Sequence, residues 1–120
     1  MPIIPLTDCV EFTAGDHCLL REMIHPDKQN LALRYSLAHA TVPAGKSTTP
    51  HRLSTSEVYY ILQGQGRMHI DDEISDVTVS DTVYIPPHAV QYITNTGEDK
   101  LTFVCIVDPA WKDENEVILA

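Results

Sequence analysis

The stretch GKSTTPHRLSTSEVYYILQG, from Gly45 to Gly64, decides the fold that this sequence predicts. A turn glycine opens it, a second glycine closes it, and the run from Val58 to Leu62 between them is typical of a β-strand. His51 and Glu57 stand six positions apart, on either side of a short Ser-Thr-Ser connection. Because side chains alternate between the two faces of a strand, both can point into one cavity. The stretch therefore predicts a polar site inside a β-structure.

Short strands continue on both sides of this stretch. We expect them at residues 17–24, 31–42, 67–71, 76–80, 82–85, 90–94 and 101–107. They recur every 8 to 12 residues or so, with turn signals between them and no helical period before the tail, which indicates an all-β sandwich or barrel. The strand at 31–42 has two unequal faces, so we expect both to be at least partly covered. Its small face carries Ser36, Ala38, Ala40 and Val42, and its bulky face carries Leu33, Tyr35, Leu37 and His39.

The 120 residues predict one domain in three parts. Residues 1–16 form an irregular N-terminal arm, interrupted by prolines and by a turn at 14–16. Residues 17–107 form the barrel, and residues 108–120 form an acidic tail. The tail is expected to be either a short helix or a packed arm, and the sequence does not choose between them.

Charge and cysteine usage exclude several classes of protein. The net charge is −9 and no basic cluster is present, so neither a nucleic acid nor an anionic membrane surface is an expected partner. The start of the chain lacks a signal-peptide pattern and no segment resembles a membrane span, so we expect a cytoplasmic protein. Cys9, Cys18 and Cys105 are odd in number and lack a C-x-x-C spacing, which argues against a disulfide framework and a zinc ribbon.

Three polar residues are candidates for a metal site. Short strands of a small barrel place alternate side chains at the same depth, and histidine, carboxylate and amide groups on neighbouring strands can ligate a divalent metal. A ring formed by His51, Glu57 and Gln91 is sterically reasonable on this basis. Without a metal, Glu57 in an apolar barrel would have a raised pKa and could act as a catalytic acid or base.

The same residues carry a resemblance to the cupin family. Its first motif, G-x5-H-x-H-x3-E-x6-G, is matched here except that Leu53 stands at the second histidine. Its second motif, G-x5-P-x-G-x2-H-x3-N, is matched at Pro86 and Asn95. Ser80 and His88 replace the glycines of that motif, and Gln91 replaces its histidine. The resemblance implies a jelly-roll barrel, the double-stranded β-helix, in a small single-domain cupin.

The resemblance also implies a metal site, from which this chain departs. The family's four ligands are three histidines and the glutamate, whereas here His51, Glu57 and the unusual candidate Gln91 remain. We expect weak or partial binding of a divalent transition metal such as zinc, iron, manganese or nickel. Two alternatives stay open: His51 and Glu57 can form a hydrogen-bonded pair without metal, and Gln91 can be a hydrogen-bonding group of the pocket. Residues expected in the pocket are Tyr35, His39, Leu53, Tyr59 and Ile93.

Two functions follow as hypotheses. The first is a metal-binding cupin that binds or converts a small oxygenated metabolite, as a dioxygenase, isomerase or lyase. The second is a metal-free cupin that binds or senses a small molecule without turnover. In either case we expect a homodimer, because a short chain with an apolar arm and tail has difficulty in burying them alone and single-domain cupins usually pair through a sheet face.

Overall fold

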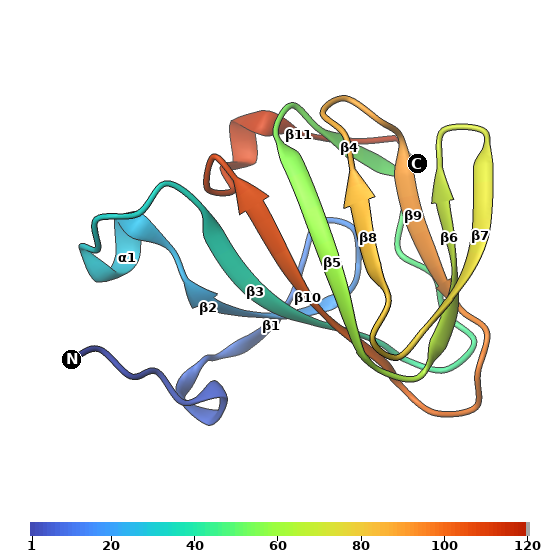
Figure 1. The fold of residues 1–120 in the computed structure, drawn as a ribbon, viewed down its shortest axis with the longest axis horizontal. Helices are drawn as coiled ribbons and strands as arrows, with labels where there is room; N and C mark the ends of the chain where they lie inside the picture. The colour runs from blue at the N-terminus through green and yellow to red at the C-terminus, as the bar shows by residue number, and fades with distance from the viewer. Residues whose placement is uncertain (120) are drawn as a thin grey trace.

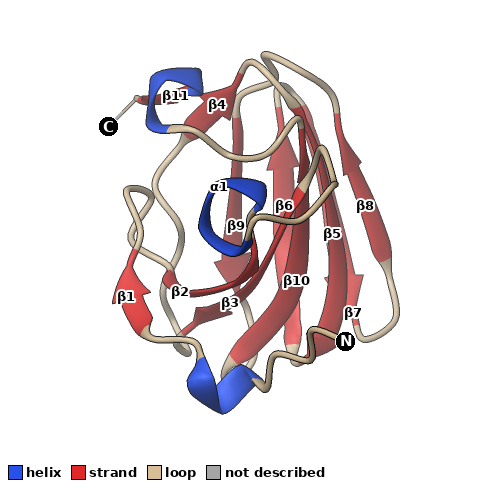
Figure 2. Ribbon diagram, turned by 90° about the vertical axis from the view of Figure 1, so that its left-hand side faces the viewer, coloured by secondary structure: helices blue, strands red, loops and turns tan. Residues whose placement is uncertain are grey.

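Two antiparallel sheets facing each other make up the fold of the computed structural model, which describes residues 1–119 (Figures 1 and 2). One sheet has six strands in the order β1-β2-β3-β10-β5-β8, and the other has five in the order β11-β4-β9-β6-β7. The six-stranded sheet consists of β1 (Glu11–Thr13), β2 (Leu19–Ile24), β3 (Ser36–Val42), β10 (Leu101–Asp108), β5 (Ser56–Gln63) and β8 (Thr82–Ile85). The five-stranded sheet consists of β11 (Glu116–Ile118), β4 (His51–Leu53), β9 (Gln91–Asn95), β6 (Gln65–Ile70) and β7 (Glu73–Thr78). The all-β jelly-roll prediction is confirmed.

Alternation along the central strands separates a core face from an outer face. In β5 the buried residues are Glu57, Tyr59 and Ile61, while Tyr60 between them is exposed. The register carries this alternation across the sheet, because Tyr59 lies opposite Cys105 of β10 and Cys105 lies opposite Ala38 of β3. Each row of the inner face thus combines side chains from several strands.

The core lies between the sheets at the end away from α1 (Pro26–Gln29). Its largest fully buried apolar side chains come from β10, β5, β8, β9 and β3, and they are Phe103, Leu101, Ile61, Ile85, Ile93 and Val42. Burial of each contributes roughly 1.5–3 kcal/mol relative to exposure. The rings of Tyr59 and Phe103 have centroids 4.4 Å apart and belong to this core.

The two glycines that bound the deciding stretch are required by the backbone. Gly45 and Gly64 have φ of 75° and 85°, the left-handed region that glycine occupies without strain. A Cβ on Gly64 would also lie 2.7 Å from the carbonyl oxygen of Lys100. Ser80 and His88, which replace the motif's other glycines, adopt φ of 74° and 69°. Positions 80 and 88 therefore have the backbone conformation that favours glycine, although neither residue is a glycine.

The predicted strands are present with shifted boundaries. The expected strand at 31–42 begins at Ser36, and the expected turn at 25–30 contains α1, whose N-terminal amide at Asp27 donates to His25 Nδ1. The arm includes η1 (Leu6–Asp8) and contributes β1 to the sheet edge. The tail combines both alternatives, since η2 (Asp113–Asn115) precedes β11, which pairs with β4; its last residue, Ala120, lies outside the described part. Residues 1–119 contain no helix of the length and apolarity that crossing a membrane requires.

Candidate functional site

A cavity of about 190 Å³ opens between the sheets next to α1, whose Lys28 lines it. The small face of β3 contributes Ser36, Ala38 and Ala40 to its wall, so short side chains leave the space that a bulky face would fill. The turn between β1 and β2, the helix α1 and the chain leading to β11 surround its rim. The remaining wall is mainly apolar or aromatic, and it includes Phe12, Leu20, Leu53, Tyr59, Phe103, Val107 and Trp111.

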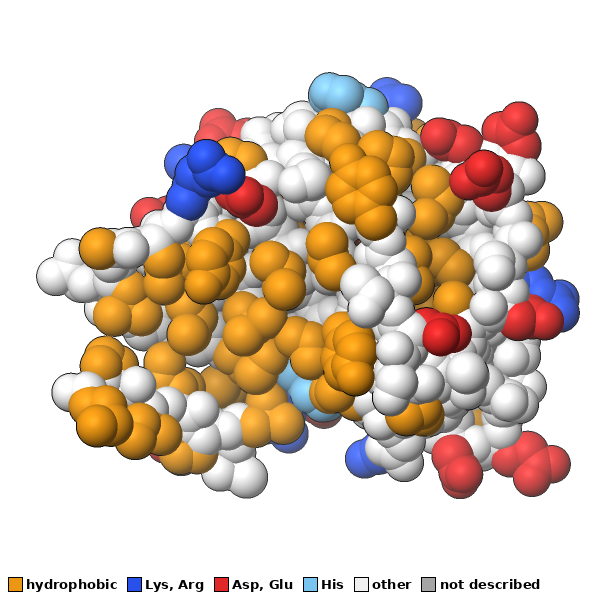
Figure 3. All heavy atoms as spheres, viewed as in Figure 1, with side chains coloured by type: hydrophobic (Ala, Val, Ile, Leu, Met, Phe, Trp, Pro, Cys, Tyr) orange, Lys and Arg blue, Asp and Glu red, His pale blue; other side chains and the backbone are white. Residues whose placement is uncertain are grey.

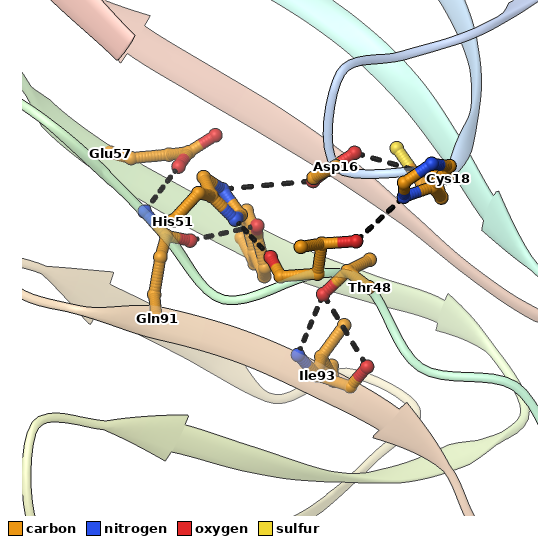
Figure 4. A network of polar contacts seen from close by, with 10 residues as sticks. Asp16, Cys18, Thr48, His51, Glu57, Gln91 and Ile93 are labelled. Atoms are coloured by element: carbon orange, nitrogen blue, oxygen red, sulfur yellow. Dashed lines mark hydrogen bonds and ion pairs between the residues drawn. The ribbon is translucent and has the colours of Figure 1, made fainter. Parts of the chain in front are cut away.

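Glu57 is the buried carboxyl group of this cavity. It comes from β5, lines the cavity and is only 6% exposed. Its Oε1 accepts a hydrogen bond of 2.9 Å from Gln91 Nε2 of the opposite sheet (Figure 4). Burial raises the pKa of Glu57 to about 8. The bond from Gln91 acts in the opposite direction and lowers this pKa, and the negative charges of Asp16 and Glu116 raise it further. Glu57 is therefore mainly protonated at neutral pH.

Gln91 holds the two sheets together at the site. It lies opposite His51 in the β4–β9 pair and is 1% exposed. Its amide nitrogen donates to Glu57, and its Oε1 accepts a bond of 3.0 Å from the hydroxyl of Tyr59. Both ends of the amide are thus occupied, and burial raises the pKa of Tyr59 well above its usual value, so this hydroxyl stays a donor.

His51 reaches the cavity from β4 with a defined orientation. Its Nδ1 lies 2.8 Å from the carbonyl oxygen of Thr49, which can only accept, so Nδ1 carries the proton and donates. Its Nε2 faces the carboxylate of Asp16 at 3.6 Å (Figure 4). The ring is 2% exposed, and the bond from Nδ1 fixes its orientation.

Asp16 is a site residue that the sequence did not indicate. It stands in the turn between β1 and β2, within the part of the chain predicted to be an arm. The turn is attached to the chain before β4, because Thr49 N donates to the Asp16 carbonyl at 2.7 Å and His17 Nδ1 lies 2.6 Å from Thr49 Oγ1. Cys18 N donates to Asp16 Oδ1, which turns the carboxylate inward. Turn composition alone carries no signal for this role.

The predicted site residues are only partly brought together. His51, Glu57, Leu53 and Tyr59 line the cavity, and Gln91 lies directly behind Glu57. The other three lie elsewhere. Tyr35 precedes β3 and is 45% exposed, and Ile93 is fully buried in the core. His39 is on the outer face of β3, whereas Ala38 is on the inner face that lines the cavity. Ile93 is held there by Thr48 Oγ1, which accepts from its backbone nitrogen at 2.9 Å. Cavity residues that the sequence does not predict to lie in the pocket include Asp16, Cys18, Glu22, Lys28, Trp111 and Glu116.

The donor set does not fit the expected metal role of Gln91. Its amide oxygen accepts from Tyr59 and its nitrogen faces Glu57, so no unoccupied end points to a centre shared with His51. Leu53 presents a hydrocarbon side chain to the cavity. Within residues 1–119, no group of three or more His, Cys, Asp or Glu side chains is arranged to hold a metal ion. His51 alone has the orientation of a typical ligand, with Nδ1 bonded to a carbonyl and Nε2 facing the cavity.

The motif residue Asn95 has a structural role. Its side-chain amide donates to the carbonyl oxygens of Val42 and Asp99 at 2.9 and 2.8 Å, and its Oδ1 accepts from Gly97 N. These bonds attach the β9–β10 turn to the end of β3. Asn95 thus fixes the closed end of the barrel, away from the cavity rim.

Comparisons with known proteins agree with this architecture. A family model described as a cupin domain matches residues 38–107. An uncharacterized protein of Methanocaldococcus jannaschii, MJ1618, is 40% identical over 109 residues, covering 90% of this chain and 86% of that protein. A cupin 2 conserved barrel domain protein from Salinispora arenicola superimposes with a TM-score of 0.78 at 16% identity, covering 95% of this chain and 91% of the other. A predicted oxalate decarboxylase from Thermotoga maritima gives 0.79 at 17% identity, covering 90% and 99%. The family match over most of the chain and the two-sheet barrel together show that this chain belongs to the cupin family.

Proposed function

We propose that this cupin binds a small amphipathic molecule in the cavity and that Glu57 exchanges a proton with it. The observation that carries the proposal is a carboxyl group buried in an apolar cavity, with a pKa of about 8 and one oxygen bonded to Gln91. A carboxyl with a pKa near neutrality can both give and take a proton at physiological pH. Its neighbours Gln91 and Tyr59 fix its position.

The size of the cavity limits the ligand. A cavity of roughly 150 Å³ accommodates benzene, and this one measures about 190 Å³. A body of six or seven carbon atoms with one polar substituent is therefore the expected scale. Benzyl alcohol has this size and serves as a neutral probe.

The experiment measures binding of benzyl alcohol by ligand-observed NMR, using untagged protein dialysed against a chelator. We expect binding by the wild type and its loss in Ala38→Leu, because the added carbons enter the cavity from the wall of β3. Thr41→Leu places the same side chain on the outer face of the same strand and should leave binding intact. Equal binding by both variants would place the probe outside the cavity and overturn the proposal.

Metal-dependent chemistry is a second candidate, favoured by one observation. His51 donates through Nδ1 to Thr49, so Nε2 carries no proton and faces the cavity beside Asp16. The predicted oxalate decarboxylase from Thermotoga maritima has the same fold, but at 17% identity that likeness extends to the fold alone. Metal analysis of untagged protein decides: a stoichiometric metal that His51→Ala removes would favour this candidate, and background metal in both proteins would refute it.

We propose that the protein is a homodimer formed through the outer face of the six-stranded sheet. Val58, Ile106 and Tyr84 lie in one row of this face, and Ile106 and Tyr84 are exposed. Figure 3 shows hydrophobic side chains gathered over these strands and the N-terminal arm. Light scattering should give twice the chain mass for the wild type and the chain mass for Ile106→Glu, because a carboxylate would be buried in the interface. A wild-type protein of single-chain mass at micromolar concentration would refute the dimer.

A further inference from the structure

Lys28 and His51 are the basic side chains on the cavity wall, and each faces a carboxylate. Lys28 Nζ of α1 lies 2.6 Å from Glu22 Oε1, an ion pair that lacks hydrogen-bond geometry. His51 Nε2 lies 3.6 Å from Asp16 Oδ2. Among residues 1–119, no arginine lines the cavity. An anionic ligand entering here would therefore meet no cation that is free to pair with it.

Acidic groups, by contrast, remain available inside. The hydrogen bonds that Glu57 makes within the described chain use Oε1 alone, and its second oxygen belongs to a side chain that is more than nine-tenths buried and lines the cavity. Glu116 of β11 also lines the cavity, next to the turn that carries Asp16, since a Cβ on Gly15 would lie 3.1 Å from Glu116 Oε1. Three carboxyl groups, those of Asp16, Glu57 and Glu116, thus surround the polar end of the space.

The rest of the wall suits an apolar body that carries a positive charge. Phe12, Tyr59, Phe103 and Trp111 contribute aromatic rings, and aromatic faces attract ammonium groups as well as hydrocarbon. Four aromatic side chains around three carboxyl groups are a recognition environment for an amine and an unfavourable one for a carboxylate. The second carboxyl oxygen of buried Glu57, which accepts no hydrogen bond within the described chain, faces this aromatic wall across the cavity.

The geometry points to a small primary amine as the ligand class of this cavity, with its ammonium group held by Glu57 and Asp16 and its apolar body against the aromatic wall. This inference rests on the proposed function, because it specifies the ligand of the same cavity. It differs from the expectation of an oxygenated metabolite, and it excludes dicarboxylates such as oxalate as ligands of the polar end.

The test uses three probes that share one body: benzylamine, benzyl alcohol and benzoate. Binding to the wild type is measured by ligand-observed NMR and calorimetry near neutral pH. We expect benzylamine to bind on the order of tenfold more tightly than benzyl alcohol, and benzoate to bind more weakly than both, because like charges placed together oppose binding. Ala38→Leu should abolish the binding of all three.

Two variants examine the carboxyl groups. Asp16→Asn and Glu57→Gln keep the size of each side chain, and each should reduce the preference for benzylamine over benzyl alcohol to about twofold or less. Glu57 holds its proton in the empty cavity, but a bound ammonium group favours the ionised carboxylate, so the glutamine removes a charge that forms on binding. A circular dichroism spectrum like that of the wild type shows that each variant remains folded. Asp72→Asn removes one negative charge from an exposed turn and should leave the preference unchanged, so it controls for the overall charge of the protein.

The outcomes separate the two proposals. If none of the three probes binds the wild type, the proposed function fails and the ligand class fails with it. If benzyl alcohol binds in the cavity while benzylamine binds no better, or if benzoate binds best, the cavity is a binding site but the amine inference is overturned. A preference for benzylamine that survives in both Asp16→Asn and Glu57→Gln would also overturn it.

Discussion

Replacement of Glu57 by Gln tests the protonated state of the buried carboxyl through its effect on stability. The native pKa of Glu57 is raised from 4.5 to about 8, chiefly by burial. Between these values the native protein holds a proton that the unfolded chain has lost. The contribution of Glu57 to stability is therefore fully present below the unfolded pKa and is lost as the pH rises through about 8.

The size of the effect follows from the shift. At about 1.4 kcal/mol for each pKa unit, the full shift corresponds to about 5 kcal/mol. Between about pH 5 and about pH 7 the wild type should lose roughly 3 kcal/mol of unfolding free energy relative to Glu57→Gln. The glutamine keeps a carbonyl oxygen for the bond from Gln91 and cannot ionise, so the comparison isolates the titration of one group.

The assay is urea unfolding of both proteins at four pH values across this range, followed by circular dichroism. The difference between the two unfolding free energies cancels the titration of groups common to both, including Asp16, Glu116 and His51, which surround Glu57. Glu98→Gln makes the same chemical change at an exposed position and should give a difference that does not vary with pH. A wild-type minus Glu57→Gln difference that stays constant within about 0.5 kcal/mol would refute the protonated, buried carboxyl.

Three further predictions concern the backbone and the ligand set. Ser80→Gly and His88→Gly should each raise the unfolding free energy by about 0.5–1 kcal/mol, because both residues occupy the left-handed region; lower melting temperatures in both would contradict this reasoning. Gly64→Ala should lower stability by more than about 1 kcal/mol, because its Cβ would meet the Lys100 carbonyl at 2.7 Å, and an unchanged urea midpoint would disprove it. Leu53→His combined with Gln91→His should increase bound metal in mass spectrometry, because imidazole is a stronger ligand than a neutral amide; a double variant with only background metal would show that His51 and Glu57 do not form part of a restorable site.

The fold could be predicted from the sequence because its signals are local. Glycines at fixed spacing, β-branched runs and polar turns each depend on a few neighbouring residues. Gly45 and Gly64 must be glycine because both have a positive φ, and the motif spacing identifies both positions. The motif spacing also placed His51, Glu57 and Gln91 at one end of the barrel, and the structure joins Gln91 to Glu57 directly.

The cavity could be predicted only in part, because its membership depends on which strand face points inward. The sequence predicts the unequal faces of β3 but not which of them points inward: the small face lines the cavity, and the face with His39 points away. Tyr35 lies outside the strand, and Ile93 belongs to the core. Asp16 is 35 positions from its partner His51, and a turn sequence carries no information about so distant a contact.

The position of Leu53 links these departures from the family pattern to the chemistry of the cavity. A histidine there would add an imidazole to the wall, whereas leucine leaves hydrocarbon beside the small face of β3. Burial is the main cause of the raised pKa of Glu57 in this apolar cavity. The side chain that bonds to Glu57 from the opposite sheet is the neutral amide of Gln91. Leu53 and Gln91 act on this pKa in opposite directions, since hydrocarbon favours the protonated carboxyl whereas the bond from Gln91 favours the ionised one, and burial outweighs that bond. On this argument Leu53→Asn alone should lower the pKa of Glu57, because a polar neighbour would solvate its ionised form, and NMR titration of the labelled carboxyl carbon would show an unchanged pKa if the argument is wrong.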